Sequence, residues 1–169
     1  MAVVTLGLTK IEVGDIASDG GMGTTLAPLG LTFQDTCKFA QDDPEETEFF
    51  AEEVDDPIVI ISRPGKVKFN FSIMDPVLAT LKKLFGGTIT GIGDDEKWEA
   101  PDKFPNIEQS VKITPEMGLK FEIPRMKITA KINGEFSKKG LFLIEVAGTV
   151  LQPEKASVAK IMASKVITG

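Results

Sequence analysis

The sequence predicts a mainly β fold, an antiparallel sandwich or barrel, with one short helix flanking it. Apolar and polar residues alternate over residues 66–73 and again over residues 119–132, and this two-residue period is typical of half-buried strands. One amphipathic helix is predicted between them, at residues 75–85. Strands and helices therefore do not alternate along the chain, as they do in parallel nucleotide-binding sheets.

The length favours a single domain over residues 1–169. No apolar run approaches the roughly 18 residues of a membrane span, so no membrane segment is expected. Residues 1–5 lack the basic segment and following apolar stretch of a signal peptide, which predicts synthesis in the cytoplasm.

The N-terminal region, residues 1–25, is expected to be flexible, because Gly20, Gly21 and Gly23 lose much conformational entropy on ordering. Residues 29–39 are predicted to form a strand that places Cys37 in or near the core. The next segment, residues 42–56, is predicted to be an acidic loop or arm.

Two strands are expected around the turn sequence Arg63-Pro64-Gly65. Residues 58–61 are a β-branched run, and residues 66–73 alternate between apolar and polar side chains. We therefore expect these two segments to pair as a hairpin.

The helix has signals at both ends. Asp75 is a favourable N-cap, and Pro76 suits the first helical position, where its missing N–H has no cost. Gly86-Gly87 suits a left-handed C-terminal cap. The apolar face, which includes Leu81, is expected to be buried against the sheet.

The C-terminal third is predicted to return to strands. The parity of the apolar positions changes at Pro124-Arg125, which indicates a bulge or bend between two strands. Residues 141–151 are predicted to be the last long strand, and residues 156–166 a short amphipathic tail helix.

The residue types argue against an enzyme. The chain has no histidine and only one cysteine, Cys37, so neither a Ser-His-Asp nor a Cys-His site can be built, and a zinc site would have a poor ligand set. Asp94 and Asp95 are a carboxylate pair, but neighbouring acids on a loop are a weak signal of glycosidase chemistry. We expect no enzymatic activity, no cofactor and no bound metal.

The net charge of −6 comes from one segment. Residues 42–56 contain nine acids and no base, whereas the remainder has 16 acids and 19 bases. A calcium site is one interpretation, but the alternating order of an EF-hand loop is absent. A solvated loop, or a charged surface in an assembly, is the alternative.

The central segment carries a resemblance to a known family. The strand at residues 66–73 runs directly into the helix at residues 75–85, and the helix ends on Gly86-Gly87. In the C-terminal third, Glu-Ile-Pro-Arg at residues 122–125 leads into a strand, and residues 141–150 follow a short turn. This order of features resembles that of the major tail tube proteins of bacteriophages, which are related to pyocin and type six secretion tube proteins.

The resemblance implies a structural function. Tube subunits of this family are β-sandwiches or barrels that join their sheets into hexameric rings, and the rings stack into a hollow tube that conducts DNA. The implied partners are further copies of the chain, a tape-measure protein, a tail terminator and a sheath, with DNA passing transiently through the lumen. The implied location is the virion tail, after synthesis in the cytoplasm of the bacterial host.

The acidic segment is the candidate interface. Phe49 and Phe50 lie in its middle, where a purely solvating loop would need no aromatic residue. We expect one of them to dock on a neighbouring subunit, with Glu52 and Glu53 at the rim of the contact or facing the lumen. The alternative is that both phenylalanines belong to the core of the subunit itself.

A second function remains open. Residues 91–110 are expected to form a loop around Trp98, which is interpreted either as buried on the sheet or as part of a ligand pocket. In the second case the protein would be a monomeric β-barrel that binds a small ligand in a closed apolar cavity, with this loop as its lid.

Overall fold

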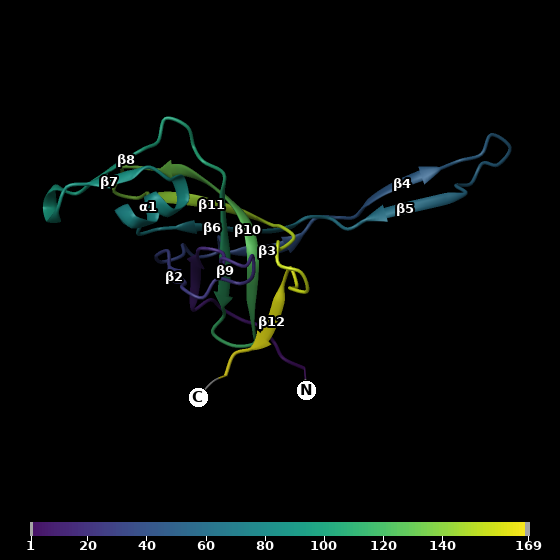
Figure 1. Ribbon diagram of the computed structural model, residues 1–169, viewed down its shortest axis with the longest axis horizontal. Helices are drawn as coiled ribbons and strands as arrows, with labels where there is room; N and C mark the ends of the chain where they lie inside the picture. The colour runs from purple at the N-terminus through teal and green to yellow at the C-terminus, as the bar shows by residue number, and fades with distance from the viewer. Residues whose placement is uncertain (1, 168–169) are drawn as a thin grey trace.

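The computed structural model describes residues 2–167, and most of them belong to one antiparallel sheet of eight strands (Figure 1). The strands follow the order β2–β1–β9–β10–β11–β6–β3, and β12 also pairs with β10. Their bounds are β1 Lys10–Gly14, β2 Ala27–Pro28, β3 Lys38–Gln41, β6 Val67–Ile73, β9 Ile107–Thr114, β10 Leu119–Gly134, β11 Phe142–Val150 and β12 Met162–Lys165.

The remaining elements are two small hairpins and the helix. Strands β4 (Glu45–Phe49) and β5 (Val59–Arg63) pair with each other, as do β7 (Thr88–Thr90) and β8 (Lys97–Glu99). A 3-10 turn, Gly93–Asp95, lies between β7 and β8. Helix α1 spans Leu78–Phe85. The predicted fold class, mainly antiparallel β with one short helix, is confirmed for the described residues.

Strand β10 bends the sheet into two layers. Its pairing with β9 shifts between Ile123 and Met126, which confirms the bulge predicted at Pro124-Arg125. Strand β9 pairs with β10 on both sides of the bulge, while the other edge of β10 pairs with β12 before the bulge and with β11 after it. One long strand therefore belongs to both layers.

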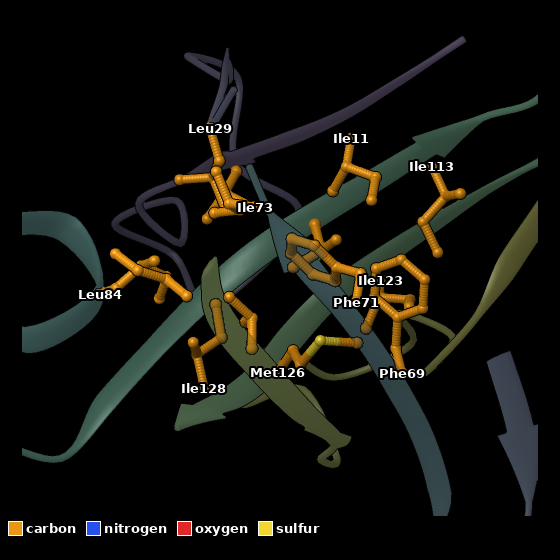
Figure 2. Close-up of a cluster of buried hydrophobic side chains, with 14 of the residues drawn as sticks. Ile11, Leu29, Phe69, Phe71, Ile73, Leu84, Ile113, Ile123, Met126 and Ile128 are labelled. Carbon is orange, nitrogen blue, oxygen red and sulfur yellow. The ribbon is translucent and has the colours of Figure 1, made fainter. Parts of the chain in front are cut away.

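The core lies between these layers. Phe69 and Ile144 come from the layer of β6 and β11, and Val13 and Ile123 come from the layer of β1, β9 and β10; all four side chains are almost completely buried. Figure 2 shows the buried side chains of both layers pointing toward one another. Phe39 of β3 lies 5.4 Å, between ring centroids, from Phe121 of β10, although these strands are far apart in the sheet order.

Helix α1 packs at one end of the two layers, but it differs from its prediction in two respects. It begins at Leu78 rather than at Pro76, since Val77 is the extended N-cap residue and no side chain caps the helix. The carboxylate of Asp75 instead accepts a hydrogen bond from the backbone N–H of Leu31, outside the helix. Leu81 is only half-buried, and Leu84 is the fully buried leucine of the helix.

The predicted hairpin of residues 58–61 and 66–73 is wrong. Strand β5 pairs with β4, and β6 pairs with β3 and β11. The segment Arg63-Pro64-Gly65 does not connect two paired strands. It links β5 of the β4–β5 hairpin to β6 of the main sheet. Strand β6 forms its ladder hydrogen bonds with β3 and β11, which are farther away in the sequence than β5.

The predicted strand over residues 29–39 is also wrong for residues 29–37, and only its last two residues belong to a strand, β3. Asp35 has a positive φ of 62°, and the segment is a loop that contacts β6 through an isolated bridge at Thr32 before β3 begins at Lys38. Cys37 precedes β3 and is exposed, not near the core.

The N-terminal region contains more structure than expected. Its residues 10–14 form β1, a central strand of one layer. The glycine-rich segment that follows is packed rather than open, since Gly20, Gly21 and Gly23 are buried. The backbone N–H of Gly23 donates to Ser110 Oγ at 2.8 Å, which ties this segment to β9.

Two further segments differ from their predictions. Residues 91–110 were expected to be a loop, but they include β8 and the first part of β9. Residues 156–166 were expected to be a helix, but Met162–Lys165 form β12. The edge of β10 before the bulge is not covered by β11, and β12 supplies its hydrogen-bond partners.

A charged pair fastens the bulge to the neighbouring strand. Arg125 donates to both carboxylate oxygens of Glu108, at 2.8 and 3.1 Å, and also to the backbone oxygen of Gln152 at 3.0 Å. These hydrogen bonds from Arg125 hold the pKa of Glu108 below its ordinary value.

We predict that Leu84→Ala lowers the free energy of unfolding by roughly 2–5 kcal/mol, because it opens a cavity beneath the helix. Leu81→Ala is the matched control and should cost clearly less, since Leu81 is half-buried. A urea titration of both variants measures the difference. Equal costs for the two variants would contradict this placement of the core.

We also predict that Glu108→Gln lowers stability in a pH-dependent way. Because the folded state depresses the pKa of Glu108, the stabilisation from its charge is present above the unfolded-state value of 4.5 and is lost as the pH falls through the folded-state pKa. Unfolding titrations from neutral to acidic pH should therefore show the gap between wild type and variant closing in acid. A gap that stays constant over this range would refute the assignment.

Candidate functional site

The β4–β5 hairpin projects from the body of the protein and lies alone at the right of Figure 1. We name residues 45–63 the acidic hairpin. Strands β4 and β5 pair only with each other among the described residues. The hairpin is therefore the part of the chain that is best placed to contact another molecule.

The base of the hairpin is anchored where β3 meets β6. The backbone N–H of Asp42 donates to the oxygen of Lys66 at 2.8 Å, and the carboxylate of Asp42 pairs with Lys68 at 2.8 Å. The segments that enter and leave the hairpin lie close together at Gly65, where an added Cβ would collide with the backbone of Asp42. These contacts extend the β3–β6 pairing outward and set where the hairpin leaves the sheet.

The strand register divides the hairpin into two unlike faces. Directly opposed residues share a face, and Phe49 lies opposite Val59 while Thr47 lies opposite Ile61. The other face pairs Glu48 with Ile60 and Glu46 with Ser62. The first face is therefore mainly apolar toward the tip of the hairpin, with the pair Glu45 and Arg63 at its base, and the other face carries two acids.

The apolar side chains of the hairpin are about half exposed. Phe49 is 52% exposed and Phe50 57%, and the apolar residues of β5 are similar. A two-stranded hairpin is marginally stable on its own in water, and both outer edges of this one are unpaired. The large apolar residues that it exposes are Phe49, Phe50, Val54, Ile58, Val59, Ile60 and Ile61.

The hairpin is also strongly charged. It carries seven acids and a single base, Arg63. None of these acids forms an ion pair within the part of the chain that the structure describes. Four of them, Glu52, Glu53, Asp55 and Asp56, lie in the connection beyond the two strands.

The structure therefore brings the predicted interface residues together on one projection. Phe49 ends β4, and Phe50, Glu52 and Glu53 follow it in the connection. All four are exposed, which contradicts the alternative that both phenylalanines belong to the core of the subunit.

Sequence patterns missed the second half of this surface. The β-branched run in β5 was assigned to a hairpin with β6 and not to the acidic segment. The available signal was the connection at residues 50–58, which holds Pro57 and the acids that favour a turn between two β segments.

Trp98 does not form a lid. Its Nε1–H donates to the backbone oxygen of Gly86 at 2.8 Å, and its ring lies 5.9 Å, between centroids, from that of Phe85. The residue packs on the end of α1 and is half-buried there.

One cavity lies elsewhere, between the layers. It has a volume of about 860 Å³, is open to solvent, and has Phe39, Phe69 and Phe121 in its wall. The polar residues that line it are Thr5, Thr9, Lys10, Thr32, Gln34, Asp35, Cys37 and Asp75.

The acidic residues do not converge on a metal site. Within residues 2–167 no group of three or more acidic or cysteine side chains is arranged to hold a metal ion. Asp94 and Asp95 are exposed in the 3-10 turn between β7 and β8. Over the same residues no helix has the length and apolar character to cross a membrane.

No family model matches the chain, and no curated protein matches it.

We predict that the body folds without the acidic hairpin. Replacing residues 44–63 with Asn-Gly should leave the melting temperature nearly unchanged, because the hairpin buries none of the core side chains and Asn-Gly closes a two-residue turn. Thermal unfolding followed by circular dichroism measures this. A large drop in the melting temperature would show that the hairpin stabilises the body.

Proposed function

We propose that this protein is a non-enzymatic structural subunit, which self-assembles into rings that stack as a tube of the phage-tail type. The supporting observation is the acidic hairpin, which holds large apolar side chains away from the body of the subunit. Exposed apolar patches that are rimmed by polar residues mark protein–protein contacts.

The energetics of the hairpin favour an assembly over a solvated loop. Its half-exposed apolar side chains would gain roughly 25 cal/mol for each Å² that a partner removes from water. A hairpin that already has its strand pairing also loses less conformational entropy on binding than a disordered arm would. The acidic loop or arm expected from the sequence therefore has a defined strand pairing of its own.

The edges of the main sheet support the same proposal. Among residues 2–167 no strand pairs with the outer edge of β3, nor with that of the two-residue strand β2 at the other end of the order. Open edges are a hazard in a monomer, and joining the sheets of neighbouring subunits hides them. The fold class and the resemblance of the central strand–helix–glycine segment to tail tube proteins agree with this arrangement.

The proposed setting follows from the resemblance. Rings would be hexameric, DNA would pass through the lumen, and the tube would meet a tape-measure protein, a terminator and, in contractile tails, a sheath. The residue types support a function without catalysis, since the chain has no histidine.

We predict that the double variant Phe49→Ser, Phe50→Ser folds but no longer polymerises. Both side chains are exposed, so the core does not depend on them, whereas a contact made by the hairpin would lose its aromatic residues. Circular dichroism checks the fold, and electron microscopy with sedimentation velocity checks assembly.

Ile92→Ser is the control for this experiment, because Ile92 is 90% exposed on the β7–β8 hairpin, away from β4 and β5. It should assemble like the wild type. Unchanged assembly of the double variant would refute the role of the hairpin.

A second candidate function rests on the cavity. Its volume falls in the range of small-ligand sites, and three phenylalanines contribute to its wall. A protein that stays monomeric at all concentrations and binds an apolar fluorescent probe, with loss of binding on Phe121→Ala, would favour ligand binding over assembly.

A further inference from the structure

We propose that the acidic hairpin of one copy docks head to tail on the connection between β10 and β11 of a second copy. We name residues 131–142 the β10–β11 tip. The inference rests on the proposed self-assembly and identifies the surface that receives the hairpin.

The two surfaces lie at opposite ends of one layer. Strand β6 begins at Val67, next to the base of the hairpin, and ends at Ile73 before α1. Ile73 pairs with Ile144, which lies near the start of β11, so the tip is at the far end from the hairpin. In Figure 1 the hairpin extends to the right, and the α1 end of the molecule lies to the left.

The tip exposes apolar side chains that match those of the hairpin. Phe136 is 93% exposed and is stacked on Phe142, with 5.5 Å between ring centroids. Ile132 and Leu141 are about half exposed beside it. Within one subunit nothing covers this group among the described residues, so its apolar side chains are available to a second copy.

The charges of the two surfaces are complementary. Lys138 and Lys139 are exposed and form no ion pair in the described chain, whereas Lys131 pairs with Glu145 at 3.0 Å. The tip carries three bases and one acid, Glu135, while the hairpin carries seven acids and one base. Oppositely charged patches steer association and determine the register of docking.

The neighbouring β7–β8 hairpin is excluded as the receiving surface. Its connection carries Asp94, Asp95 and Glu96, which are exposed and would repel the acids of the hairpin. The tip, in contrast, is an apolar surface whose unpaired lysines, Lys138 and Lys139, have the sign opposite to that of the hairpin.

A contact of this kind joins two different surfaces of the same chain. Each copy offers one hairpin and one tip, so every copy can bind two neighbours. Such a head-to-tail contact closes into a ring when its rotation allows, and otherwise extends as a filament.

Charge reversal tests the pairing. Variant A is Lys138→Glu, Lys139→Glu, and variant B is Glu52→Lys, Glu53→Lys. Each variant alone should need at least about tenfold more protein than the wild type to assemble, because like charges then meet at the contact. An equimolar mixture of A and B should assemble at the wild-type concentration, since each reversed surface finds its complement on the other variant.

Glu46→Lys, Glu48→Lys is the matched control. It makes the same change in net charge on the face of the hairpin that is opposite to Phe49. It should assemble close to the wild-type concentration. Circular dichroism confirms that each variant is folded, and sedimentation velocity measures assembly.

The outcomes separate this inference from the proposed function. If the wild type assembles and variant A assembles equally well, the tip is not the receiving surface, while self-assembly stands. If variants A and B each fail to assemble and their equimolar mixture also fails, the proposed contact between the hairpin and the tip is overturned. If the wild type remains monomeric, both proposals are overturned.

Discussion

The bulge at Pro124-Arg125 is the constraint on which the rest of the structure depends. It lets one 16-residue strand serve two layers, since β10 pairs with β12 before the bulge and with β11 after it, while β9 pairs with both parts. Proline has no N–H to give to a ladder, so it suits a position where pairing is interrupted. Without this bend the apolar faces of the two layers would not meet.

Polar contacts hold the bulge in place. Ser110 is completely buried, and its hydroxyl donates to the backbone oxygen of Pro124 at 2.7 Å while accepting from Gly23. Arg125 binds Glu108 on the neighbouring strand. These bonds satisfy backbone groups that the interrupted ladder leaves free, and they also fix the glycine-rich segment against the sheet.

The outward position of the acidic hairpin follows from the same architecture. The pairing of β3 with β6 occupies the edge of β6 that β5 would need in order to pair with β6, and β5 pairs with β4 in a separate hairpin instead. Seven acids on this excursion oppose its return to a compact surface. The apolar residues that remain exposed are the physical basis for the proposed contact between subunits.

Local pattern determined much of this protein. The two-residue alternation in residues 66–73 and 126–132 predicted β6 and the later part of β10, and the change of parity predicted the bulge, because side-chain alternation depends only on neighbouring residues. The acidic segment with Phe49 and Phe50 predicted the candidate site. Only the tertiary structure decided which strands pair: β5 with β4, and β12 with the early part of β10. Strand partners are chosen by hydrogen bonds and packing between residues far apart in the chain, and a local pattern carries no information about that choice.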